Sequence, residues 1–141
     1  MTGTIPSNLQ LRQMYYMDLG RNQFSGTLPA SLGTDYVRLR HLYLDHNNFE
    51  GTVPSEIINA GNGRLHSLRL NDNQFVGEMP GNYQSITEMN LLEVQNNNFT
   101  SMDSNTCKLW VFDGGELVDF KSDCSVCNCG NKSTMCRHCS K

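Results

Sequence analysis

Residues 39–54 read LRHLYLDHNNFEGTVP, and the fold of the chain follows from the pattern in this stretch. Its segment Leu42-Tyr43-Leu44 alternates apolar and polar side chains, as expected of a strand with one buried face. Asn47, Phe49, Gly51 and Pro54 then follow at steps of two, two and three residues. Because Gly frees the backbone and Pro fixes φ, we expect this second half to form a tight extended segment.

The same order of residue types returns about every 25 residues along the first part of the chain. The Phe residues are spaced by 25, 26 and 24 positions, and an Asn stands two residues before each. These Phe and Asn residues are Phe24, Phe49, Phe75 and Phe99, and Asn22, Asn47, Asn73 and Asn97. The first three units also carry Gly26, Gly51 and Gly77, and Pro29, Pro54 and Pro80. Such self-similarity indicates stacked units, because no single unit can bury its apolar face alone.

The apolar positions before each Asn are also in register from unit to unit. They are Leu11, Met14, Met17 and Leu19; Tyr36, Leu39, Leu42 and Leu44; Leu65, Leu68 and Leu70; and Ile86, Met89, Leu92 and Val94. Stacking places the strands of successive units side by side in a parallel sheet, about 4.8 Å apart. We expect the Asn amides to bond the backbone of the adjacent coil and the Phe rings to stack inside the coils.

The consensus of these units, LxxLxxLxLxxNxFxGxLPxxL, resembles the leucine-rich repeat of the plant type. The resemblance covers residues 3–104, from a partial unit at Gly3-Thr4-Ile5-Pro6 to a fourth repeat with Ser101 and Ser104 in place of Gly and Pro. It implies an α/β-type solenoid, a leucine-rich repeat superhelix with a parallel β-sheet on the concave face and a few short 3-10 helices on the convex face. We therefore expect one partial and four full repeats in residues 1–104, and a half-repeat with a Cys-rich cap in residues 105–141.

The start of the chain predicts a longer protein. The chain opens halfway through a repeat, without the cap that the end of a solenoid needs for solubility. We therefore expect it to be the C-terminal portion of that protein, and to be monomeric when the repeats before Met1 are present. The first residues also lack the basic and apolar regions of a signal peptide.

Composition and motifs argue against several functions. With 11 Lys and Arg, 14 Asp and Glu and no basic run, the chain lacks the basic face that nucleic-acid binding requires. No stretch approaches the roughly 18 consecutive apolar residues of a membrane span. No phosphate loop, kinase signature or localised carboxylate pair occurs, so we predict neither an enzyme nor a cofactor. We also predict no metal, because Asn73 of the Asn71-Asp72-Asn73 triplet belongs to the Asn column and the spaced ligands of an EF-hand are missing.

All six cysteines lie in the C-terminal part, at Cys107, Cys124, Cys127, Cys129, Cys136 and Cys139. Four of them form a CxxC-x8-CxxC pattern, whose thiolates suit tetrahedral zinc. The six can instead pair as three disulfides that close the end of the solenoid. A catalytic thiol is a third interpretation, in which His138 would have to meet a cysteine in space together with an orienting third group.

Two glycosylation sequons, at Asn98 and Asn131, are typical of a secreted chain. Plant-type leucine-rich repeat domains, which this chain resembles, are usually extracellular and closed by disulfides. The resemblance therefore favours the disulfide cap over the other two interpretations, in a glycoprotein that is secreted or displayed at the cell surface.

The residues between the buried strand positions are expected to point outward from the concave sheet. They form columns across the strands, and the first two read Asp18, Tyr43, Arg69, Glu93, Lys121 and Tyr16, His41, Ser67, Leu91, Asp119. A third column reads Tyr15, Arg40, His66, Asn90, Val118. Tyr and Arg are enriched at binding hot spots. The outward apolar residue Leu91 suggests either a partner or packing under a neighbouring loop. The predicted ligand-binding residues are Tyr16, Asp18, Arg40, His41, Tyr43, His66, Arg69, Leu91 and Glu93.

A structural interpretation of one column stands beside the functional one. Arg69, Glu93 and Lys121 alternate in charge on neighbouring strands, so they can form a ladder of cross-strand ion pairs.

The sequence thus predicts an extracellular recognition module that binds a protein, peptide or cell-wall polysaccharide and has no catalysis of its own. Known plant-type relatives include receptor ectodomains and secreted inhibitors of cell-wall enzymes, which the chain resembles in repeat architecture. The alternative is a structural or surface-adsorbing protein that binds ice or cell wall. Adsorption needs a flat column of repeated small polar residues, whereas the outward columns here are heterogeneous.

The disulfide cap can be tested on protein from an oxidising source. Three disulfides would lower the intact mass by about six hydrogens relative to the reduced chain, with no metal bound. Reduction should loosen the part after residue 105 first, because each bridge typically contributes about 2–4 kcal/mol. One zinc ion per chain, with thiols that react after its removal, would show instead that the cysteines form a metal site.

Overall fold

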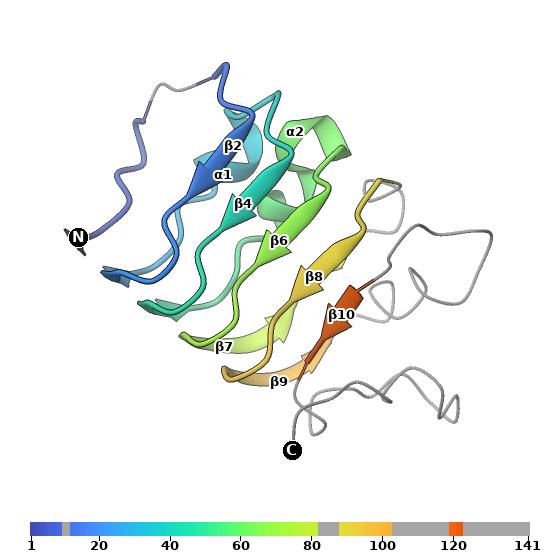
Figure 1. The fold of residues 1–141 in the computed structure, drawn as a ribbon. Coiled ribbons are helices and arrows are strands. Elements are labelled where there is room, and N and C mark those ends of the chain that lie inside the picture. The colour runs from blue at the N-terminus through green and yellow to red at the C-terminus, as the bar shows by residue number, and fades with distance from the viewer. Residues whose placement is uncertain (10–11, 82–87, 103–118, 123–141) are drawn as a thin grey trace.

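The described part of the chain is a stack of similar coils, four of which pass through a strand of one sheet and then a strand of another (Figure 1). This computed structural model describes residues 1–9, 12–81, 88–102 and 119–122. The elements in chain order are β1 (Thr2–Gly3), β2 (Tyr16–Asp18), β3 (Gln23–Gly26), α1 (Ser31–Thr34), β4 (His41–Tyr43), β5 (Asn48–Gly51), η1 (Ser55–Asn59), α2 (Ala60–Gly63), β6 (Ser67–Arg69), β7 (Gln74–Met79), β8 (Leu91–Glu93), β9 (Asn98–Met102) and β10 (Asp119–Lys121).

The first sheet is parallel, in the order β10-β8-β6-β4-β2, and it confirms the sheet that the period-two pattern predicts. The middle residues of these strands pair in register, with Met17 beside Leu42, Leu42 beside Leu68, and Leu68 beside Leu92. All four side chains are buried. The residues on either side of them in each strand therefore point away from the core, as alternation along a strand requires.

The second sheet, in the order β1-β3-β5-β7-β9, was not predicted from the sequence, which indicated only an extended segment. Its strands also run parallel, and Phe49 of β5 pairs with Gly26 of β3. Gly51 has φ +75°, a left-handed backbone conformation that residues other than glycine rarely adopt. A sequence pattern with such a glycine predicts a turn rather than a strand. These segments pair as strands because the coils are stacked in register.

Short helical turns connect the second sheet to the first sheet in two of the coils (Figure 1). Four-residue α1 follows Pro29, and five-residue η1 follows Pro54 and leads into α2. Leu32 of α1 and Ile57 of η1 are buried, so the turns cover the core between the two sheets. The short helices that the repeat family implies are confirmed.

The phenylalanine column forms a stack through the core, as expected. Phe24, Phe49, Phe75 and Phe99 have ring centroids 6.1, 6.3 and 6.1 Å apart, and successive planes differ by only 3°, 10° and 16°. Phe49 and Phe75 are fully buried. Each ring thus packs on a ring of the next coil, a contact that one coil alone cannot make.

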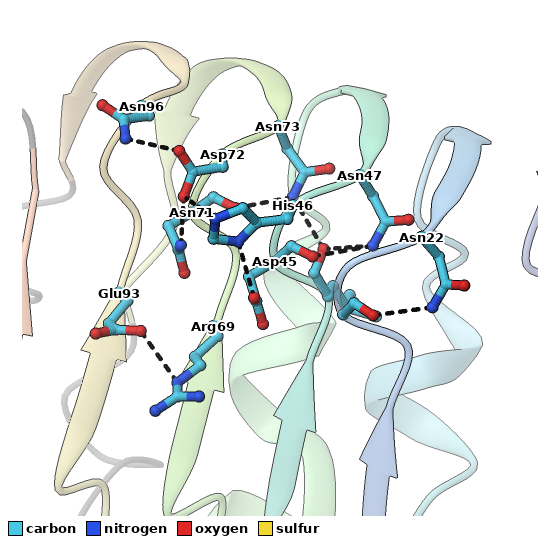
Figure 2. A network of polar contacts seen from close by, with 12 residues as sticks. Asn22, Asp45, His46, Asn47, Arg69, Asn71, Asp72, Asn73, Glu93 and Asn96 are labelled. Carbon is cyan, nitrogen blue, oxygen red and sulfur yellow. Dashed lines mark hydrogen bonds and ion pairs between the residues drawn. The ribbon is translucent and has the colours of Figure 1, made fainter. Parts of the chain in front are cut away.

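The asparagine column joins neighbouring coils through hydrogen bonds to their backbone (Figure 2). Asn73 is buried, and its Oδ1 accepts from the Phe49 amide of the preceding coil at 3.0 Å. Its Nδ2 donates to the carbonyl of Leu44 in that coil at 2.9 Å, and to those of Leu70 and Asn71 in its own coil at 3.1 and 3.2 Å. One side chain therefore satisfies four backbone groups at the turn where the chain leaves the first sheet.

The last described strand, β10, pairs with β8 through Phe120 and Leu92, so the backbone forms one further strand after residue 104. The six cysteines, Asn131 and the rest of the predicted cap lie outside the described residues.

Replacing Asn73 with Ala should destabilise the fold strongly. The substitution leaves buried backbone donors and acceptors in two coils without partners, so we expect a loss of about 2–4 kcal/mol in the free energy of unfolding. Urea denaturation would measure it. The matched control is Asn48→Ala, whose exposed side chain should change stability by less than about 0.5 kcal/mol. Equal stability of the two variants would contradict the role assigned to the asparagine column.

Candidate functional site

The outward columns predicted from the sequence are aligned across the first sheet. Backbone pairing places Asp18, Tyr43, Arg69, Glu93 and Lys121 side by side on successive strands, and likewise Tyr16, His41, Ser67, Leu91 and Asp119. Amides at the start of the strands bond the carbonyls of Tyr15, Arg40 and His66 one coil back, which aligns the third column through Asn90. The face of this sheet, hereafter the strand face, therefore presents residues from five strands that are far apart in sequence.

An aromatic cluster occupies the β2–β6 part of the strand face. It consists of Tyr15, Tyr16, His41, Tyr43 and His66. The Tyr16 ring lies 5.3 Å from that of Tyr43 and nearly perpendicular to it, and the His41 ring lies 5.7 Å from both Tyr15 and Tyr16. His41 also lies 5.9 Å from His66, which extends the cluster to a third coil. Tyr15 and Tyr16 are 56% and 50% exposed, so the cluster is open to solvent.

Two arginines lie over the tyrosine rings. The Cζ atom of Arg69 is 4.6 Å from the Tyr43 ring centroid, and that of Arg40 is 5.9 Å from the Tyr15 ring centroid. Both separations fall within the range of cation–π attraction. Arg40 also donates from Nη1 to the carbonyls of Leu39 and Gly61, which hold its side chain along the edge of the cluster.

The cluster favours neutral side chains at its centre. Burial, followed by the nearby His66 and Arg40, lowers the pKa of His41 below its ordinary value. Its Nδ1 lies 3.2 Å from the Ser67 hydroxyl. Desolvation and then the Asp18 carboxylate raise the pKa of Tyr16, so its phenol keeps its proton. Neutral imidazole and phenol groups can each donate and accept hydrogen bonds to a polar ligand.

On the β6–β10 side, the structure confirms the predicted ladder of cross-strand ion pairs. Glu93 Oε2 is 3.0 Å from Arg69 Nε, and Oε1 bonds the Lys121 ammonium. Glu93 is only 8% exposed, and both of its carboxylate oxygens are engaged in the ladder. Its role in ligand binding stays a prediction. Leu91 lies beside Ser67 on the strand face and is half-buried.

A polar cluster at the ends of the strands was missed from the sequence (Figure 2). Asp45 Oδ2 lies 3.0 Å from His46 Nδ1, and Asp72 Oδ2 lies 3.4 Å from His46 Nε2. Asp72 also accepts from Asn71 Nδ2 at 2.6 Å and from Asn96 Nδ2 at 2.7 Å. This cluster joins three successive coils through their side chains.

The sequence does contain a pattern that predicts this cluster, at the residue just before each asparagine of the asparagine column. Arg21, His46, Asp72 and Asn96 stand there, and all have positive φ values, from 52° to 57°. This left-handed conformation turns the side chain at the end of each strand in the same direction in every coil. A repeated polar position before the asparagine could therefore have indicated a fourth aligned column.

Within residues 1–9, 12–81, 88–102 and 119–122, no group of three or more His, Cys, Asp or Glu side chains is arranged to hold a metal ion. The helical elements described in those segments are too short to cross a bilayer. Asn98 of the first sequon is exposed at the start of β9.

Comparison with known proteins identifies the family. The Leucine Rich Repeat family matches residues 13–34 and 38–60. Receptor-like protein 39 of Arabidopsis thaliana is 32% identical over 102 residues, which are 71% of this chain and 11% of that protein. The chain belongs to the plant-type leucine-rich repeat proteins.

Other relatives of this leucine-rich repeat chain give the same result. Receptor-like protein 18 of Arabidopsis thaliana is 38% identical over 93 residues, 66% of this chain and 10% of that protein. A solved plant peptide hormone receptor, RGFR1 in complex with RGF2, is similar with a TM-score of 0.74 at 28% identity, over 86% of this chain and 19% of that one. The chain spans about a tenth of the length of these two curated relatives.

Replacing Arg69 with Met should lower stability measurably, because it removes one of the two cations beside the buried Glu93 carboxylate. Since Lys121 remains and Arg69 is partly exposed, we expect a loss of only about 1 kcal/mol in urea denaturation at low salt. The matched control is Arg64→Met, because Arg64 and its partner Glu88 are both largely solvated and 3.7 Å apart. If both variants lose the same small amount, the ladder contributes no more than a surface pair.

Proposed function

We propose that this leucine-rich repeat chain is an extracellular recognition module that binds a peptide or protein ligand through the strand face and has no chemistry of its own. The observation that carries this proposal is the aromatic cluster, whose two most exposed tyrosines are Tyr15, directly before β2, and Tyr16, the first residue of β2. Tyrosine offers a large contact area at little cost in side-chain entropy, which is typical of binding surfaces.

A peptide fits this surface better than an extended flat solid. The columns of the strand face change residue type from coil to coil, as Tyr16, His41 and Ser67 do in one column. A regular crystal or wall surface would require the same residue type in each coil, so the surface-adsorbing alternative is disfavoured. RGFR1, to which the chain is similar, is a peptide hormone receptor, which supports a peptide as the ligand class.

The cysteines and the sequons bear on the compartment of the proposed module. Six cysteines close together and an exposed sequon at Asn98 suit an oxidising compartment in which disulfides and glycans form. We include the disulfide cap, the glycans at Asn98 and Asn131, and a secreted or cell-surface location in this proposal. A cell-wall polysaccharide remains the second ligand class, because tyrosine rings can also stack on sugars.

The proposed function is tested by affinity selection of a random-peptide library on the immobilised chain. Peptides selected on the wild type should bind Tyr16→Ala and Tyr43→Ala about 1–3 kcal/mol more weakly, because each variant removes an anchor of the aromatic cluster. Calorimetry would measure the loss.

The matched control is Val76→Ala, which trims a side chain of the second sheet that is 41% exposed, and it should bind as the wild type does. Equal affinity of all three variants for the selected peptides would place the binding surface elsewhere. An oligogalacturonide or other cell-wall oligosaccharide that binds where no peptide does would favour the second ligand class.

A further inference from the structure

His41, the first residue of β4, is half-buried at the centre of the aromatic cluster. Its ring contacts four others, with centroids 5.7, 5.7, 6.3 and 5.9 Å away, from Tyr15, Tyr16, Tyr43 and His66. Its Nδ1 lies 3.2 Å from the Ser67 hydroxyl, whereas its Nε2 makes no hydrogen bond with any described residue. Because a hydroxyl can donate or accept, the Ser67 bond persists in both charge states, and Nε2 is the nitrogen left for a ligand.

His41 differs from the other histidines of the described segments in its lack of a carboxylate partner. His46 lies 3.0 and 3.4 Å from two aspartates, and His66 lies 3.7 Å from Glu88. In the same segments, no Asp or Glu oxygen lies within 4.0 Å of the His41 ring nitrogens. Asp18 of the neighbouring strand accepts from a tyrosine hydroxyl of the cluster instead. A proton on His41 therefore adds a positive charge that no carboxylate of these segments pairs with.

The charged groups that act on His41 are cationic. Arg40 precedes it, and the hydrogen bonds of Arg40 go to backbone carbonyls rather than to a carboxylate. Burial, then His66 and Arg40, hold the pKa of His41 below its ordinary value. The folded chain thus favours the neutral imidazole, so folding loses stability as the pH falls below the ordinary histidine range. A ligand carboxylate beside Nε2 would neutralise the added charge and favour the protonated ring.

We propose that His41 sets the charge preference of the peptide-binding surface, by taking up a proton when an acidic side chain of the ligand binds at its Nε2. This inference rests on the proposed function, because it assigns an acidic residue to the peptide that the strand face receives. The carboxylate accepts from the Nε2–H of the imidazolium, and the neighbouring peptide residues pack on Tyr15 and Tyr16, which are exposed beside it. Acidic peptides therefore bind more tightly as the pH falls.

The pH range of this effect follows from the two groups involved. Histidine changes charge between about pH 5 and 8, and its bond to a carboxylate is strengthened by the charge. Below about pH 4 an acidic side chain of the ligand takes up its own proton, so the gain ends there. The half-buried position of His41 reduces the screening of its charge by salt.

The test is an NMR titration of the histidine rings in the whole chain, with N-acetyl-glutamate amide as the probe. We expect the glutamate probe to raise the pH midpoint at which the His41 ring titrates. N-acetyl-glutamine amide, which has the same shape without the charge, should leave that midpoint unchanged. The ring of His46 is the internal control: it lies outside the aromatic cluster, so neither probe should move its midpoint.

Affinities of two variants complete the test. The wild type should bind the glutamate probe about three- to tenfold more tightly at about pH 5.5 than at about pH 7.5. His41→Gln can still bond Ser67 but carries no charge, so its affinity should be the same at both pH values. His46→Gln is the matched control and should keep the pH dependence of the wild type. Heteronuclear spectra would show that each variant is folded, and the His41 midpoint of the wild type decides if one is not.

Two results would overturn the proposal. One is a His41 midpoint that the glutamate probe leaves unchanged, or that both probes raise equally. The other is a pH dependence of binding that persists in His41→Gln.

Further outcomes separate this proposal from the proposed function. Library peptides that bind the aromatic cluster equally well at both pH values would leave the proposed function standing and remove the role of His41. A midpoint raised by the glutamate probe, when the library yields no peptide, would support the site at His41 and overturn the peptide as its ligand.

Discussion

The bond between the asparagine side chain of one coil and the backbone of the preceding coil is the interaction on which the rest of the structure depends. Asn47 and Asn73 accept hydrogen bonds from the backbone amides of Phe24 and Phe49, and they donate to the carbonyls of Leu19 and Leu44. These bonds satisfy backbone groups at the turn where the chain leaves the first sheet, where a loop would otherwise bury them without partners. They also fix how far each coil is rotated relative to the coil before it.

Fixed stacking converts positions in the repeat into straight columns on the surface. The phenylalanine rings can stack at nearly constant spacing only if every coil has the same shape at that point. The same constraint aligns Tyr43 with Arg69 and Arg69 with Glu93 on the strand face. Residues about 25 positions apart in sequence thus become neighbours. Each coil contributes one residue to each column of the surface.

The residue types of the strand face differ between its two ends. Toward β2 it presents exposed tyrosines and a neutral histidine, bordered by the carboxylates of Asp18 and Asp45. Toward β10 its charges neutralise one another, because the Glu93 carboxylate contacts cations on both neighbouring strands. The exposed aromatic rings and the mutually neutralised charges therefore lie at opposite ends of the strand face.

The repeat period, the buried positions and the outward columns could be predicted from the sequence, because each depends only on spacing along the chain. Met17 and Leu42 are buried and Tyr16 is exposed, as strict alternation requires. Only the tertiary structure decided what the aligned residues do to one another. The second sheet, the burial of Glu93 and the contact of His46 with Asp72 arise between coils. There, side-chain direction and backbone hydrogen bonding depend on a stacking that no local pattern encodes.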